Sequence, residues 1–141
     1  MLIVLLVTFI VIQFIPNTLT QENPPVSGEP KWDSPETRET FFKACADCHS
    51  NETRFPWYGT VAPISWMIEN EVKNGRKHFN ISEWDRRQQG GDKTADAVQR
   101  GAMPTGPYLL MHPRTNLNIE EKKKFVEGLM KTFRSTKHGQ L

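Results

Sequence analysis

Both cysteines of this 141-residue chain lie in one short stretch, FKACADCHS, where Cys45 and Cys48 are three residues apart and His49 follows directly. This spacing restricts the chemistry of the chain more than any other feature does. Such a pair serves as a disulfide, as half of a zinc site, as a thiol redox pair or as the attachment site of a haem. Each of these uses needs a different setting in the rest of the sequence.

The rest of the chain argues against three of the four uses. A disulfide would close a very small loop and would stabilise little, because the gain grows with loop length. A zinc site needs four ligands, and the other histidines lack zinc-ligand spacing. A thioredoxin-type pair follows a strand, and no stretch here alternates like one. We therefore predict one covalently bound haem c, with Cys45 and Cys48 holding the porphyrin and His49 as the proximal iron ligand.

Haem iron has a second axial position, for which Met103 is the favoured ligand. Met103 lies in the stretch RGAMP, a loop bounded by glycine and followed by proline, from which a side chain can project. His112, in Met111-His112-Pro113, is the alternative distal ligand. Met67 and Met130 fall on apolar helical faces and are expected to pack in a core. The remaining candidates, His78 and His138, lie in polar surroundings and are expected at the surface.

Helical signals dominate after residue 33. Ser34 and Pro35 form a helix start, and Asn118 with Glu121 has the capping-box pattern ahead of an apolar stripe. We expect helices over residues 35–45, 63–74, 82–89, 92–100 and 118–133. The sequence thus predicts an all-α domain over residues 34–141, small enough for the haem to supply much of its core.

The N-terminus is a separate unit. Residues 2–15 are almost wholly apolar, but as a helix they would extend about 21 Å, short of a hydrocarbon core of about 30 Å. We assign residues 1–16 to a membrane anchor or signal segment and residues 17–33 to a Pro-rich tether. An uncleaved anchor is favoured, since no alanine occurs before Ala44 to make a cleavage site. We expect an inner-membrane anchor with the domain in the periplasm, or, if the segment is cleaved, a soluble periplasmic protein.

The charge balance excludes one class of partner. The chain has 18 basic and 16 acidic residues, a formal net charge of +2, which is too small and too mixed for nucleic-acid binding. The expected partners are extracytoplasmic redox proteins, with the membrane contacted through the N-terminal segment.

From about residue 41 to residue 133 the chain resembles a family of small monohaem cytochromes, the haem-binding domain proteins of Bacteroidetes-type bacteria. The matching stretches, in order, are CADCHSN, WY with VAP and SW, EV with GR, FN with SEW, and MP with Tyr108 and HP. The resemblance implies a cytochrome-c-like fold, haem attachment at Cys45 and Cys48, His49 as proximal ligand and Met103 as the distal one. It also implies a short apolar anchor. The Gly90-Gly91 break and the long approach to His112 depart from the pattern, so the distal ligand stays open between Met103 and His112.

Other residues could contact such a haem. Arg76 is a candidate partner of a haem propionate, with an exposed cation at a helix end as the alternative. Trp57, Tyr58, Trp66 and Trp84 could line the haem, although simple packing is the commoner role of such residues.

The function depends on whether both axial positions of the haem iron are occupied by side chains. If His49 and Met103 occupy both axial positions, the expected function is transfer of single electrons rather than catalysis. If the sixth position is open or labile, a haem peroxidase or a gas-binding or sensing domain is the alternative, with His112 as the nearest acid-base group. A haem-bearing accessory domain of a larger complex is a third hypothesis.

Overall fold

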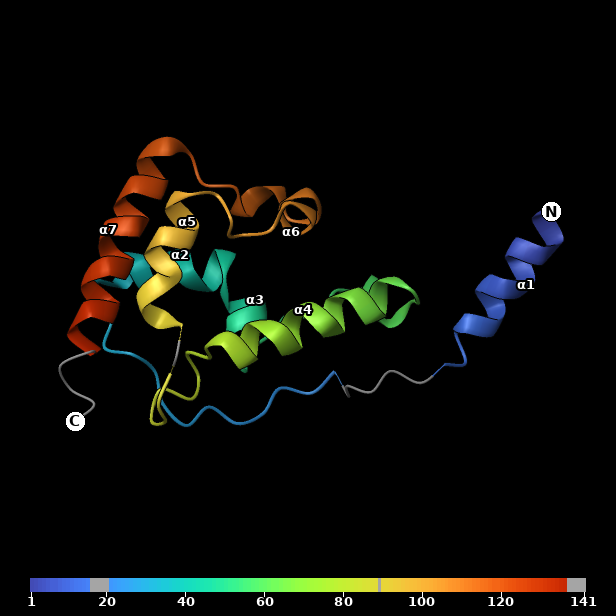
Figure 1. Cartoon of the computed structure of the whole chain (residues 1–141), viewed down its shortest axis with the longest axis horizontal. Coiled ribbons are helices and arrows are strands. Elements are labelled where there is room, and N and C mark those ends of the chain that lie inside the picture. The colour runs from blue at the N-terminus through green and yellow to red at the C-terminus, as the bar shows by residue number, and fades with distance from the viewer. Residues whose placement is uncertain (16–20, 89, 137–141) are drawn as a thin grey trace.

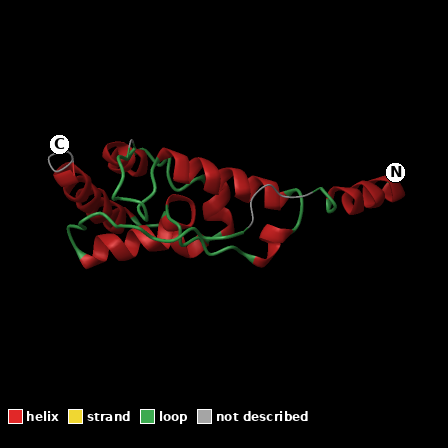
Figure 2. Cartoon of the chain, turned by 90° about the horizontal axis from the view of Figure 1, so that it is seen from below, coloured by secondary structure: helices red, strands yellow, loops and turns green. Residues whose placement is uncertain are grey.

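The computed structural model describes residues 1–15, 21–88 and 90–136. Its α-helices are α1 (Leu2–Ile12), α2 (Pro35–Ala44), α3 (Ala46–His49), α4 (Ile64–His78), α5 (Thr94–Gln99), α6 (Gly106–Met111) and α7 (Ile119–Thr136). Three 3-10 turns, η1 (Trp57–Thr60), η2 (Gly91–Lys93) and η3 (Pro113–Thr115), join them. These described ranges contain no strand, only one isolated bridge between Gly28 and Glu83 (Figure 2). The predicted all-α class is confirmed.

The two clearest predicted helices begin where the sequence indicates. The Ser34 hydroxyl accepts a hydrogen bond from the Thr37 amide at 3.2 Å and so caps α2. Ahead of α7, the Glu121 amide donates to Asn118 Oδ1 at 2.9 Å, and the Asn118 amide donates to Glu121 Oε2 at 2.8 Å. This reciprocal pair is a capping box, which satisfies amides that the first helical turn leaves free.

The apolar core lies where α2, α5 and α7 meet, at one end of the molecule (Figure 1). α7 contributes a buried stripe, as its 3.6-residue periodicity predicts. Met130, which we expected in this stripe, is 37% exposed and lies at its edge. The buried members of the core are Phe41, Ala46, Phe79, Ile81, Ala95, Val98, Phe125, Val126, Leu129 and Phe133. Because Ala46 belongs to the C-x-x-C-H motif and Phe79 stacks on its histidine, the core fixes the motif in place.

α4 packs beside α3 and runs further than predicted (Figure 1). We expected it to stop at Asn74-Gly75, but it continues to His78. Its expected apolar face is also only partly buried, since Met67 is 60% exposed. The prediction that Met67 packs in the core is wrong. Gly75 therefore lies within the helix and does not end it. It has a packing role, which is described below.

The predicted helix over residues 82–89 is absent from its described part, residues 82–88. Polar side chains there hold the backbone in turns instead. The Ser82 amide donates to Asn80 Oδ1 at 3.0 Å, and the Gln88 side chain donates to the Glu83 carbonyl at 2.7 Å. Such local side-chain bonds compete with helical hydrogen bonds. The next predicted helix, over residues 92–100, corresponds to η2 and α5 and ends at Gly101, whose φ of +71° suits glycine.

α1 stands apart from the other helices (Figure 1), and its side chains are exposed except for the half-buried Ile12. Just beyond it, the Gln13 side chain exchanges two hydrogen bonds with the Ala62 backbone, at 3.1 and 2.9 Å. No helix among the described residues combines the length and the apolar character needed to cross a membrane.

Residues 21–33 are extended, but they lie along the helical domain and do not hang free of it. Asn23 and Thr53 are joined by two hydrogen bonds, at 3.0 and 3.1 Å. Further on, the Ser27 and Gly28 amides donate to the Ser82 carbonyl, and the Trp84 amide donates to the Gly28 carbonyl. The described part of the expected tether therefore belongs to the folded unit.

Candidate functional site

The C-x-x-C-H motif forms a single helical turn, α3, which follows α2 directly. Cys45 ends α2 and begins α3, so the chain changes direction there. The Cys48 and His49 amides both donate to the Cys45 carbonyl, at 3.2 and 3.0 Å. This turn brings the two thiols and the imidazole to one side of α3, where both cysteines are free thiols.

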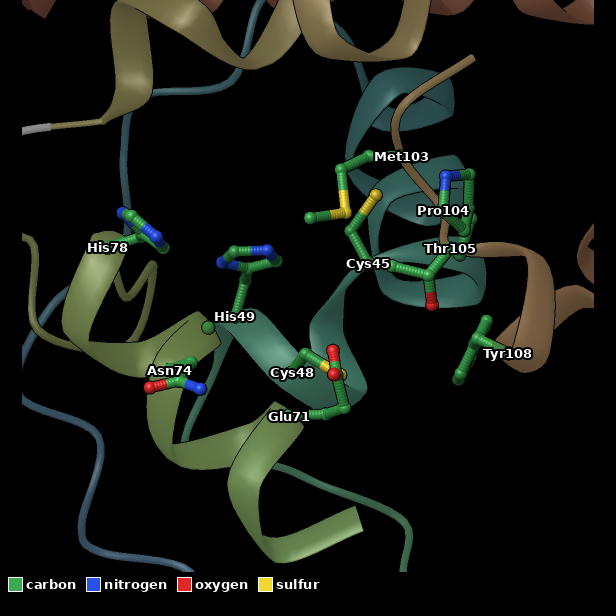
Figure 3. A pocket seen from close by; sticks show the side chains of 12 residues that line it. Cys45, Cys48, His49, Glu71, Asn74, His78, Met103, Pro104, Thr105 and Tyr108 are labelled. Carbon is green, nitrogen blue, oxygen red and sulfur yellow. The ribbon is translucent and has the colours of Figure 1, made fainter. Parts of the chain in front are cut away.

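A pocket of about 220 Å³ opens beside this turn (Figure 3). The motif supplies one wall and α4 a second, while the loop before α6 closes the pocket opposite them. Its lining residues are Ala44, Cys45, Cys48, His49, Glu71, Asn74, Gly75, His78, Met103, Pro104, Thr105 and Tyr108. Four residues predicted as haem ligands from sequence thus share one cavity, although Met103 is far from the others in the chain.

His49 is held in a defined orientation. Its ring is 8% exposed and stacks on Phe79 at 4.3 Å with an interplanar angle of 16°. Nδ1 lies 3.2 Å from the Phe79 carbonyl oxygen, which can only accept, so Nδ1 carries the proton and donates. Nε2 is then left with its lone pair. Burial lowers the pKa of His49, which favours the neutral imidazole that metals bind.

The two thiols belong to half-buried residues. Burial raises the pKa of Cys45 to about 12, and burial together with the nearby Asp47 and Glu71 carboxylates raises that of Cys48 to about 11. A thiol redox pair needs a lowered thiol pKa so that a thiolate is present at neutral pH. The environment here has the opposite effect, which disfavours the thiol redox alternative.

Met103 reaches the pocket from the loop between α5 and α6. Its amide donates to the Ala97 carbonyl at 3.2 Å, which ties the start of the loop to α5. Figure 3 shows the Met103 thioether pointing into the space beside Cys45 and His49. The side chain is 38% exposed, so it forms part of the pocket's outer wall and not of the core.

The other candidate ligands lie elsewhere. His112 does not line this pocket. Its ring stacks on Tyr108 at 4.3 Å and its Nδ1 lies 3.1 Å from the Tyr108 carbonyl oxygen. The neighbouring Met111 is 53% exposed. His78 is exposed, as expected, yet it lines the pocket from the end of α4. His138 lies outside the described residues.

Arg76 and the aromatic candidates also face away from the pocket. Arg76 donates to the Ser50 carbonyl through Nε at 2.9 Å, and to Asn23 and Thr53 through Nη2, each at 2.9 Å. Arg76 lies in the last turn of α4, as the alternative role expects, but it is half-buried and its guanidinium is bonded to these oxygens. The propionate role stays a prediction. None of Trp57, Tyr58, Trp66 and Trp84 lines the pocket described above, and Trp57 is 82% exposed.

Sequence reasoning missed the contribution of α4. Gly75 lies so close to Cys48 that a β-carbon there would overlap the Cys48 carbonyl, which lets α4 form a wall of the pocket. Glu71, Asn74 and His78 line the pocket from the same helix. Their spacing of three to four residues places them on one helical face, and this spacing is the sequence signal that could have identified them as site residues.

Tyr108 was also missed as a site residue. Its hydroxyl donates to Asp47 Oδ2 at 2.7 Å, and Asp47 is one of the two residues between the cysteines. Burial and this hydrogen bond raise the pKa of Tyr108 above its ordinary value, so the hydroxyl keeps its proton.

The donor set fits a haem c. The two neighbouring thiols could form the thioether links to the porphyrin, while an imidazole whose Nδ1 is held by a carbonyl and a thioether on the facing loop are ligands suited to haem iron. The volume of about 220 Å³ is below the usual range for cofactor sites, about 300–1,000 Å³. The pocket must therefore widen to hold a porphyrin.

Comparisons with curated proteins and with solved structures found no match. A comparison with protein families found one: residues 7–131 match the haem-binding domain. This match covers the pocket and nearly all of the described chain, and it supports haem as the cofactor. The chain therefore belongs to the haem-binding domain family.

Proposed function

We propose that this protein is a monohaem c-type cytochrome that carries single electrons between redox proteins outside the cytoplasm. The observation that carries the proposal is the common pocket of Cys45, Cys48, His49 and Met103. In this proposal Cys45 and Cys48 are the attachment pair, and His49 and Met103 are the two axial ligands. Ligation of that kind leaves no open coordination position and favours electron transfer over catalysis.

Each residue has a separate task in this proposal. The Cys45 and Cys48 thiols hold the haem covalently, while His49 offers Nε2 to the iron because the Phe79 carbonyl holds Nδ1. Met103 closes the remaining position from the loop before α6. A haem held in this way supplies one-electron Fe(III)/Fe(II) chemistry, and the thioether ligand favours the reduced state.

We further propose that α1 attaches the protein to the membrane and that the domain acts in the periplasm. The support is the apolar, exposed surface of α1, together with the need for an oxidising export compartment in which C-x-x-C-H sites are filled. Cell fractionation tests this proposal. The full chain should sediment with inner membranes, and a chain in which a cleavable export signal replaces residues 1–20 should be recovered in the periplasmic fraction.

A second function is favoured by one observation, the exposure of Met103. A 38% exposed ligand on a loop that forms an outer wall is less firmly held than one in a core. If Met103 leaves the iron, the sixth position binds diatomic gases or peroxide. The protein is then a gas sensor or a peroxidase rather than an electron carrier.

Absorption spectra of the matured protein separate the two functions. The ferric wild type should show the far-red sulfur-to-iron band, and its ferrous form should not bind carbon monoxide. Met103→Ala should lose the band and bind carbon monoxide. Met67→Ala is the matched control, because Met67 is exposed on α4 and does not line the pocket. A wild type that binds carbon monoxide would overturn the electron-carrier proposal.

Covalent attachment is tested separately on a denaturing gel stained for haem. The wild type should keep its haem after denaturation, and the Cys45→Ser/Cys48→Ser double variant should lose it. Loss of haem from the denatured wild type would show that the family's cofactor is bound here without thioether links.

A further inference from the structure

The Tyr108 hydroxyl links two parts of the pocket that are far apart in the sequence. It lies on α6, in the segment that closes the cavity, and donates to the Asp47 carboxylate on α3 at 2.7 Å. Asp47 stands between the two cysteines, so the hydrogen bond joins the Met103 side of the pocket to the C-x-x-C-H turn.

The acceptor of this bond is fixed. The Asp47 side chain is 10% exposed, and its other oxygen accepts from the Arg54 amide at 3.0 Å and from Arg54 Nε at 3.3 Å. The Asp47 carbonyl accepts from the Thr53 hydroxyl at 2.7 Å. A carboxylate held by charged and backbone donors gives a stronger hydrogen bond than a neutral acceptor does.

Little else holds the segment that carries the donor. None of the residues of α6 is buried, and Leu110 and Met111 are 80% and 53% exposed. Apolar burial, usually the main source of helix docking energy, therefore contributes little here. The stacking of Tyr108 on His112 lies within the same segment and does not tie it to the rest of the domain.

Met103 lies between two fixed points. Its own amide is bonded to the Ala97 carbonyl on α5, and Tyr108 is bonded to Asp47 five residues later. Figure 3 shows Met103, Pro104, Thr105 and Tyr108 lining the pocket in succession. Releasing Tyr108 frees one end of this short loop. The Met103 thioether is then no longer held at one position in the pocket.

We propose that Tyr108, held by Asp47, is the positioning residue that keeps Met103 over the haem site, and that breaking this bond opens the sixth iron position. The inference rests on the proposed role of Met103 as distal ligand. It makes occupation of the sixth iron position depend on the hydrogen bond between Tyr108 and Asp47, neither of which binds the iron.

Tyr108→Phe tests the proposal because it removes the hydroxyl and keeps the ring that stacks on His112. Loss of a hydrogen bond to a carboxylate should raise the open fraction by roughly tenfold to a hundredfold. The far-red band of the ferric protein should weaken, and the ferrous protein, unlike the wild type, should bind carbon monoxide. Asp47→Asn, which keeps an acceptor oxygen, should have a smaller effect. Tyr58→Phe is the matched control, since it alters the other tyrosine of the chain, which does not line the pocket.

Hydrogen exchange in the haem-loaded full chain gives a second readout. The amides of Leu109 and His112, bonded to the Thr105 and Tyr108 carbonyls, should exchange faster in Tyr108→Phe than in the wild type. An unchanged band, unchanged carbon monoxide binding and unchanged exchange would overturn the positioning role, while the wild-type spectra would still support Met103 ligation. If the wild type itself lacks the band, it is the proposed function that fails.

Discussion

Gly75 of α4 lies directly against the backbone of Cys48, in the turn that carries the two thiols. A β-carbon at position 75 would overlap the Cys48 carbonyl carbon and oxygen. The approach of α4 to the motif therefore depends on a residue without a side chain, even though glycine weakens a helix interior.

Gly75→Ala should destabilise the protein despite the higher helix propensity of alanine. Overpacking against a fixed backbone costs about 1–3 kcal/mol, since neither helix can move without disturbing the core. Thermal unfolding followed by circular dichroism measures the loss, and haem content should fall with it. Gly106→Ala is the control, because a β-carbon there meets nothing within 4 Å. Equal stability of the two variants would contradict the close packing.

Deletions at the N-terminus should show how much residues 21–33 contribute to the stability of the domain. Removing residues 1–20 deletes the two Gln13–Ala62 hydrogen bonds and should lower the unfolding temperature less than the longer deletion does. Removing residues 1–30 deletes the Asn23–Thr53 pair and the Gly28 contacts with Ser82 and Trp84. At about 0.5–1.5 kcal/mol for each hydrogen bond, this should cost about 3 kcal/mol or more. If both deletions unfold at the same temperature, the segment is a free tether after all.

Local patterns explain most of what could be predicted from the sequence. The caps at Ser34 and Asn118 act within one helical turn, so their residue types are enough to place the starts of α2 and α7. The C-x-x-C-H turn is equally local. Met103 was predicted because a methionine between glycine and proline has no helical stripe to join, and it does line the pocket.

The failures share a cause, which is contact between residues distant in sequence. Gly75 reads as a helix stop unless its approach to Cys48 is known, and Arg76 reads as an exposed cation unless Asn23 and Thr53 are known to bond it. Near position 82, the distant hydrogen bond from the Asn51 amide to the Ser82 hydroxyl adds to the local bonds that hold the chain in turns. Propensity is overridden at each of these places by tertiary contacts.

The ion pair between Glu29 and Arg38 should make stability depend on pH. Two hydrogen bonds of 2.8 Å from Arg38 hold the pKa of Glu29 below its ordinary value. The stabilisation is thus fully present above the unfolded-state pKa of about 4.3 and is lost as the pH falls through the lower folded-state pKa. Urea unfolding of the wild type and of Glu29→Gln should differ at pH 7 and converge below about pH 4.

Glu120→Gln is the control for this pH effect. Glu120 is 71% exposed, and its pair with Lys124 spans 3.7 Å on the surface of α7. Exposed pairs of this kind contribute little, so the variant should follow the wild type at every pH. A constant difference in stability between Glu29→Gln and the wild type down to pH 3 would show that this substitution acts through something other than the ionisation of Glu29.

Arg76 should matter for stability and not for the haem. Its guanidinium joins α4 to the Ser50 carbonyl and to Asn23 and Thr53, a geometry that a planar fork of donors can satisfy and a lysine cannot. Arg76→Lys should therefore lower the unfolding free energy by about 2 kcal/mol, which denaturant unfolding measures. Arg86→Lys is the control, because Arg86 is 57% exposed and its pair with the neighbouring Glu83 lies on the surface. If Arg76→Lys instead shifts the reduction potential and leaves stability intact, Arg76 contacts a haem propionate, and the hydrogen bonds seen here do not describe the haem-loaded protein.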